Sequence, residues 1–136
     1  MLYEKDMIKC RGCAAKISYA PLKSALKRLD YIESLADDSI DIGILIDGKN
    51  LIQSVDGFPS LISDPWLNGR FLAFHACSDI WACGGSVISA QSIINLPPLS
   101  NQLQQELLFQ VLEGINSALT IQGAKVIGGH TLESRK

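Results

Sequence analysis

Residues 40–56 read IDIGILIDGKNLIQSVD, and this stretch says the most about the fold. Isoleucines alternate with other residues, the pair Asp47-Gly48 follows, and apolar residues resume after it. An Asp-Gly pair between such segments is typical of a tight hairpin, because both turn positions favour positive φ. The pattern therefore predicts two antiparallel strands, at about 40–46 and 50–56.

Helix and strand patterns flank this hairpin on both sides. Apolar residues recur at helical spacing in three other segments, and runs rich in Ile, Val and Ser have strand length. Proline near the first turn, Asp or Ser as N-cap and glycine after the last turn mark the helix ends. The predicted elements are a helix from Pro21 to about Asp37, a helix from Pro65 to Gly84-Gly85, a strand over 87–94, a helix from Ser100 to Gly123 and a strand over 124–127. This order predicts an α/β (α+β) domain with a mixed sheet of about four strands and helices on one face.

Length and composition limit the class of protein. The chain has 136 residues and a net charge of -2, which suits one domain with one core and gives no basic face for nucleic acid. Its apolar runs are far shorter than the roughly 20 residues that cross a bilayer, and its N-terminus is charged, so we expect a cytoplasmic protein. Four cysteines do not make a disulfide framework, so we expect thiol chemistry.

Three aspartates are candidates for a cation site. Asp56 is expected at the end of one hairpin strand, Asp41 near the start of the other, and Asp79 beside the apolar stripe of the second helix. Carboxylates on neighbouring elements can hold magnesium together with water and phosphate oxygens. The competing interpretation is that Asp79 is a solvated residue at the edge of the stripe, and that Asp41 is a strand-edge charge.

Two further motifs suggest a phosphate site and a reactive thiol. The glycine run Gly128-Gly129-His130-Thr131 follows a short strand, where backbone N–H groups can approach phosphate oxygens, although a plain tight turn explains it equally. In residues 1–20, which we interpret as a flexible arm, Cys13 and Lys16 lie three residues apart, and a nearby ammonium makes a thiol more nucleophilic.

Other roles are weighed for the remaining cysteines and for one histidine. Cys10 and Cys13 form a C-x-x-C pair, but no second ligand pair for zinc accompanies them. Cys77 and Cys83 are expected to be small core residues, and His75 a half-buried residue with nucleotide contact as the alternative.

Four blocks together resemble the N-terminal half of the selenophosphate synthetase (selenide, water dikinase) family, within the wider aminoimidazole ribonucleotide synthetase superfamily. In this chain they read GCAAKI at 12–17, QSVDGF at 53–58, DP at 64–65 with GR at 69–70 and ACSDIWACGG at 76–85, and GGHT at 128–131. They follow the family's order at close to its spacing. The resemblance implies an aminoimidazole ribonucleotide synthetase N-terminal domain-like fold over residues 21–136, preceded by the catalytic arm over 1–20, with the family's C-terminal domain absent from this chain.

The resemblance also implies an activity: ATP, selenide and water give selenophosphate, AMP and phosphate. It implies that Cys13 and Lys16 are catalytic, that Lys16 and Gly128, Gly129, His130 and Thr131 contact the nucleotide, and that Asp41, Asp56 and Asp79 bind Mg²⁺, with Asp38 as a rival to Asp41. It further implies a homodimer formed through the sheet. Phosphoryl transfer agrees with such a set, because it needs carboxylates for metal and cations for developing charge.

The chain departs from this family at two positions. His75 replaces the usual asparagine, and the hairpin begins Asp41-Ile42-Gly43 in place of an Asp-Ala-Ala run. Two alternatives therefore remain open. One is a superfamily relative of the thiamine-monophosphate kinase or aminoimidazole ribonucleotide synthetase type, and the other is a dimerisation domain without catalysis. Isolated residues 1–136 are expected to be inactive, because the missing domain contributes to the nucleotide cleft.

Overall fold

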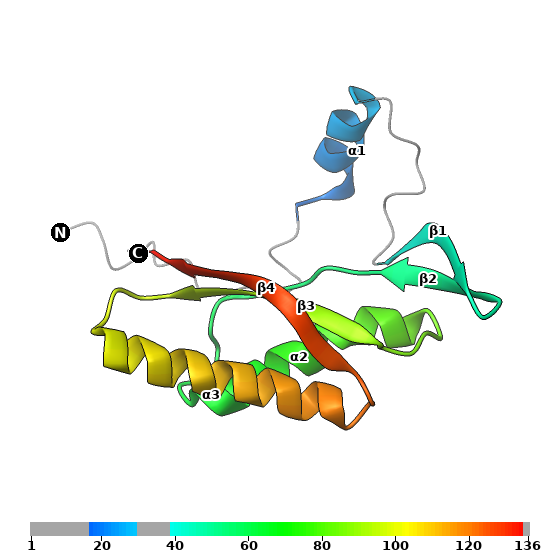
Figure 1. Cartoon of the computed structure of the whole chain (residues 1–136). Coiled ribbons are helices and arrows are strands. Elements are labelled where there is room, and N and C mark those ends of the chain that lie inside the picture. Colours follow the sequence, from blue (N-terminus) through cyan, green and yellow to red (C-terminus); the bar gives the residue numbers. More distant parts are fainter. Residues whose placement is uncertain (1–16, 30–38, 135–136) are drawn as a thin grey trace.

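The computed structural model describes residues 17–29 and 39–134 of the chain. Its helices and strands follow the predicted order of element types (Figure 1). They are α1 (Tyr19–Lys27), β1 (Ile40–Ile46), β2 (Lys49–Gln53), α2 (Pro65–Ala82), β3 (Ser89–Leu96), α3 (Asn101–Thr120) and β4 (Lys125–Glu133). Within this part of the chain, no helix is both long enough and apolar enough to cross a membrane.

The predicted hairpin is confirmed, with a shorter second strand. Asp47 and Gly48 both have positive φ, at 50° and 74°, as the turn requires. β1 and β2 pair antiparallel, and the first residue of β1, Ile40, lies opposite Gln53. Residues after Gln53 therefore have no partner within β1, so the strand ends there and not at Asp56 as predicted.

The four strands form two sheets, not the single mixed sheet that we expected. β1 and β2 make one antiparallel pair, and β3 and β4 make a separate parallel pair. The parallel pair needs a long crossover, which α3 supplies. The composition of elements was predicted correctly, but strand patterns along a chain do not specify which strands share hydrogen bonds.

Helices α2 and α3 begin where the capping residues predict. Asp64 is the N-cap of α2, its side chain accepts a hydrogen bond from the Leu67 N–H at 2.9 Å, and Pro65 follows as the first helical residue. α1 differs from the prediction, because it begins before Pro21 and ends at Lys27, while residues 30–37 of the predicted helix lie outside the described ranges.

The core lies between the two long helices and the parallel strands. α2 and α3 lie on the same side of β3 and β4 (Figure 1). The glycines Gly69 and Gly114 allow a very close approach of the helices, since a Cβ at either position would collide with the backbone of the other helix. The buried apolar residues are Ala73, Cys77, Ile94, Leu96, Ile115, Ala118, Leu119 and Ala124.

β4 is longer than predicted and includes the glycine run. Val126 pairs with Ala90, and Gly128 pairs with the next residue of β3, so Ile127 forms a bulge. Gly128 to Thr131 then continue the ladder with β3. A Cβ at Gly129 would lie 2.0 Å from the Ser92 carbonyl oxygen, so the close strand approach requires glycine there. The run is therefore part of a strand, not the loop after one.

Candidate functional site

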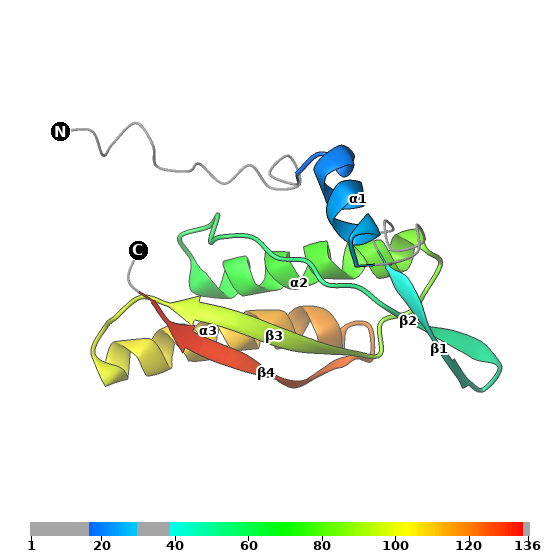
Figure 2. The same ribbon diagram turned by 90° about the horizontal axis from the view of Figure 1, so that it is seen from above.

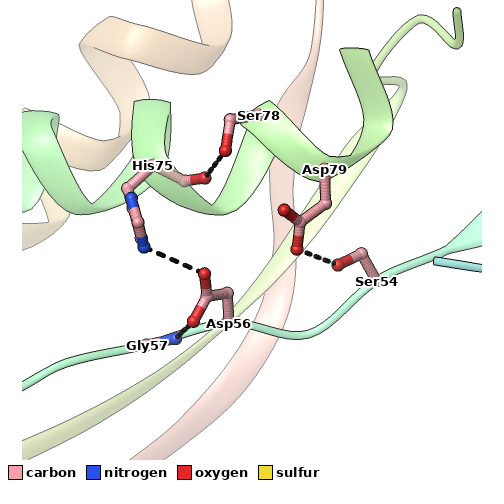
Figure 3. A network of polar contacts seen from close by, with 6 residues as sticks. All are labelled: Ser54, Asp56, Gly57, His75, Ser78 and Asp79. Atoms are coloured by element: carbon pink, nitrogen blue, oxygen red, sulfur yellow. Dashed lines mark hydrogen bonds and ion pairs between the residues drawn. The ribbon is translucent and has the colours of Figure 1, made fainter. Parts of the chain in front are cut away.

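Two carboxylates, one from each of two neighbouring elements, each have a polar partner on the other element. The segment after β2 runs alongside α2 in the opposite direction (Figure 2). The Ser54 hydroxyl donates a hydrogen bond of 2.9 Å to Asp79 Oδ2 on the helix. Asp56 Oδ2, on the segment, lies 2.9 Å from His75 Nε2 on the helix (Figure 3). Each carboxylate is thus held by a side chain of the opposite element.

The spacing of these residues explains why two contacts form in register. His75 and Asp79 are four residues apart, so they lie on one face of α2, separated along the axis by about 6 Å. Ser54 and Asp56 are two residues apart, which is about 6 to 7 Å in extended chain and puts both side chains on one side. The two repeats match, so an extended segment can contact the helix twice.

Both oxygens of Asp56 are engaged. The Gly57 N–H donates to Oδ1 at 2.7 Å, and His75 bonds to Oδ2. The Asp56 side chain is 18% exposed and the His75 side chain 29% exposed, so this contact is partly shielded from water. The Phe58 ring packs edge-on against the imidazole, with ring centroids 5.1 Å apart. The carboxylate therefore has a defined orientation.

The donor set fits a hard cation. Asp56, Asp79 and the Ser54 hydroxyl offer only oxygen atoms, and magnesium is commonly held by one or two carboxylates together with water and phosphate. Within residues 17–29 and 39–134, no group of three or more His, Cys, Asp or Glu side chains is placed to hold a metal by itself. The arrangement therefore suits a cation that arrives with phosphate oxygens, and not a closed structural metal site.

The other predicted site residues lie elsewhere or outside the described ranges. Asp41 is in the hairpin, where its carboxylate accepts hydrogen bonds from the Gly43 N–H at 2.8 Å and from Asn50 Nδ2 at 2.7 Å. Among the described residues, Asp41 does not join Asp56 and Asp79 in a cluster of three that could hold a metal. Gly128, Gly129, His130 and Thr131 lie in β4, while Cys13, Lys16 and Asp38 lie outside the described residues.

Cys77 in α2 and Cys83 at its C-terminus differ in burial. Cys77 is buried in the core, as predicted, and burial raises the pKa of its thiol, an effect that the Gln122 hydrogen bond partly offsets. Cys83 is exposed and lies 2.8 Å from the Ser39 hydroxyl, so its predicted place in the core is wrong. It is the C-cap residue of α2, directly before Gly84, whose positive φ turns the chain away from the helix.

Sequence reasoning missed Ser54 and assigned His75 no specific partner. The signal for Ser54 was its spacing of two from Asp56, which puts both on one side of an extended chain. The signal for His75 was its spacing of four from Asp79. Neither spacing identifies the facing element, so the contacts require the tertiary structure.

Comparison with known proteins identifies the family of this chain. The family described as "AIR synthase related protein, N-terminal domain" matches residues 37–136. A selenide, water dikinase of Nitratidesulfovibrio vulgaris is 32% identical over 94% of this chain, and one of Clostridioides difficile is 32% identical over 96%. A selenide, water dikinase 2 of Peptoclostridium acidaminophilum is 33% identical over 96% of the chain. The chain spans 39% of the length of each of these relatives. It thus belongs to the AIR synthase related protein, N-terminal domain family.

Proposed function

We propose that this chain is the N-terminal, ATP- and magnesium-binding part of a selenide, water dikinase, which forms selenophosphate, AMP and phosphate from ATP, selenide and water. The curated relatives, which match nearly the whole chain, are named for this activity. The observation that carries the proposal is the pair Asp56 and Asp79, held on two facing elements by His75 and Ser54. Such a pair suits the magnesium that accompanies a polyphosphate.

Asp56 and Asp79 would hold the cation in this proposal. Magnesium, when bound, would offset the negative charge of the phosphates during transfer. The hairpin carboxylate Asp41 stays a predicted third ligand. Each of the three acts as a charged oxygen donor, and the Ser54 hydrogen bond fixes which Asp79 oxygen faces the segment.

The glycine run and the N-terminal arm have proposed roles beside this pair. β4 pairs with β3 along one edge, and no described strand covers its other edge. We propose that backbone N–H groups of Gly128 to Thr131 contact nucleotide phosphates. Lys16 would add a positive charge at the phosphates. The Cys13 thiolate would interact with selenide, because sulfur and selenium are both soft atoms.

The partners follow from the same proposal. Because the chain spans 39% of its relatives, we propose that a further domain completes the nucleotide cleft and that residues 1–136 alone do not catalyse. We also propose a homodimer through the sheet, supported by exposed isoleucines along β1 and on β3. ATP and reduced thiols suit the cytoplasm, where we propose that the enzyme acts.

The test is AMP formation by the full-length protein with and without selenide. We expect AMP only when selenide is present, and a loss of about 100-fold or more in Cys13→Ser and Lys16→Ala, because each removes a group at the reacting atoms. Cys83→Ser and Lys49→Ala are matched controls that keep activity. Formation of AMP independent of selenide would contradict the proposal. Formation of ADP with a different acceptor would favour another enzyme of the superfamily.

A further inference from the structure

His75 contacts a proposed cation ligand from the opposite element. Its Nε2 lies 2.9 Å from Asp56 Oδ2, and Asp56 has its other oxygen on the Gly57 N–H at 2.7 Å. An ionised carboxylate accepts about four hydrogen bonds or ligand contacts, two at each oxygen. One contact on each oxygen therefore fixes the plane of the carboxylate and leaves further lone pairs for a cation.

The imidazole is itself held in place. Phe58 contacts its ring edge-on at 5.1 Å between centroids, and Phe58 in turn lies 5.7 Å from the Phe71 ring on α2. His75 and Phe71 are four residues apart on the helix, so Phe58 sits against both. The segment that carries Asp56 thus contacts α2 through a polar residue and an aromatic residue that are two positions apart in sequence.

We infer that His75 is a positioning residue, which holds the Asp56 carboxylate in the orientation that receives a divalent cation. The inference rests on the proposed cation site. Ser54 does the corresponding work for Asp79, with a hydroxyl in place of an imidazole. Outer partners of this kind orient the first ligands, and their loss commonly lowers metal affinity by about 10- to 100-fold.

The test measures Mn²⁺ binding to the full-length protein, with Mn²⁺ alone as the probe and water proton relaxation as the signal. His75→Phe keeps a ring beside Phe58 and removes the donor, so we expect Mn²⁺ affinity to fall about 10-fold. His75→Gln restores an amide donor at similar reach, so we expect it to retain most of the affinity. The double variant Asp56→Asn/His75→Phe is expected to bind no more weakly than Asp56→Asn, because His75 acts through Asp56.

The outcomes separate this inference from the proposed site. If Asp56→Asn and Asp79→Asn weaken Mn²⁺ binding but His75→Phe does not, the positioning role is wrong and the site stands. Equal losses in His75→Phe and His75→Gln also overturn the role, since the donor then has no effect. If neither aspartate variant changes Mn²⁺ binding, the cation site itself is wrong. Thermal unfolding of each variant checks the fold, and His75→Met replaces His75→Phe if the latter does not fold.

Discussion

Cys77 and Cys83 show how strongly position within one helix changes a side chain's chemistry. Cys77 faces the core among Ala73 and Ala118, whereas Cys83 caps the helix in contact with water. The thiolate is the reactive form of cysteine, and burial disfavours it. The two residues are six positions apart in sequence, yet only one is available to a reagent.

We expect iodoacetamide to modify Cys83 much faster than Cys77 in the folded protein. The pKa of the buried Cys77 thiol is raised, so less thiolate is present at a given pH and a higher pH is needed for reaction. Because the pKa of Cys77 is raised in the folded state, its contribution to the free energy of unfolding is present at low pH and is lost as the pH rises through that pKa. Peptide mass mapping gives the two rates. In urea the two cysteines should react alike, and equal rates in the native protein would contradict the prediction.

The site residues could be predicted in type but not in pairing. Asp79 stood out because a carboxylate beside an apolar stripe needs a partner or a cation, and Asp56 because it was expected at the end of a strand near another carboxylate. Their partners Ser54 and His75 are ordinary residues in the sequence, and they gain a role only because the segment after β2 runs along α2. Asp41 has the same residue type, but hairpin geometry gives it local partners.

At the scale of elements, close backbone contacts depend on single glycines. Gly128 and Gly129 are neighbours in β4 with similar φ values of 158° and 155°. A Cβ at Gly128 meets nothing within 4 Å, whereas a Cβ at Gly129 lies 2.0 Å from Ser92 of β3. The two positions therefore have similar backbone strain, and they differ in the room available for a Cβ atom.

We expect Gly129→Ala to lower the free energy of unfolding by about 1 to 3 kcal/mol more than Gly128→Ala, the usual cost of forcing atoms into a packed region. Urea denaturation of both variants measures the difference. Gly128→Ala serves as the control for strain, because Gly128 has a similar φ and a Cβ there meets no neighbouring atom. Equal effects of the two substitutions would show that β3 and β4 do not approach so closely.

The contact between α2 and α3 leads to a similar prediction. A Cβ at Gly69 would lie 2.2 Å from the Val111 carbonyl oxygen, and one at Gly114 would lie 2.0 Å from that of Trp66. Alanine normally favours a helix over glycine by about 1 kcal/mol. We nevertheless expect Gly69→Ala and Gly114→Ala to destabilise by about 1 to 3 kcal/mol, because the helices must move apart. The exposed substitution Asn116→Ala on α3 is the control, and it should have little effect on the urea midpoint.

The types and order of the elements were predicted well, but the strand pairing and the packing face of α2 were not. The caps and the Asp-Gly turn are local signals, and they located α2, α3 and the hairpin within a few residues. The apolar stripe of α2 was misleading, because three of its large residues, Leu67, Phe71 and Trp81, are 47%, 48% and 41% exposed. The face that packs holds the small residues Gly69, Ala73 and Cys77, since a close helix contact excludes large ones.

At the scale of the whole molecule, one face of each sheet lacks a cover within the described residues. Ile93 on β3 is 71% exposed on the side opposite to the buried Ile94. Every residue of β1 is exposed as well. Apolar surface of this kind commonly marks an interface.

If the proposed dimer forms through this surface, Ile93→Lys should dissociate it. Each copy would lose about 1.5 to 3 kcal/mol of apolar burial, so the two symmetric copies together should weaken the dimer by roughly 100-fold to 10,000-fold in Kd. Sedimentation velocity of the full-length protein over a concentration series measures this change. Ile121→Lys, at a residue that is 67% exposed beyond the end of α3, is the matched control and should leave the dimer intact. A wild-type monomer, or an Ile93→Lys dimer of unchanged affinity, would contradict the prediction.

The poorly buried hairpin of β1 and β2 is also expected to open more often than the helical core. A two-stranded hairpin without buried residues is marginal in water, so β1 and β2 are expected to open on their own in the monomer, long before α3 and its buried residues do. Amide hydrogen exchange should therefore be fast from Ile40 to Gln53 and slow through the middle of α3. Ser54 and Asp56, directly after the hairpin, are bound to α2, so we expect the opening to stop before Ser54. The hairpin can unfold and refold many times while the two carboxylates stay in register.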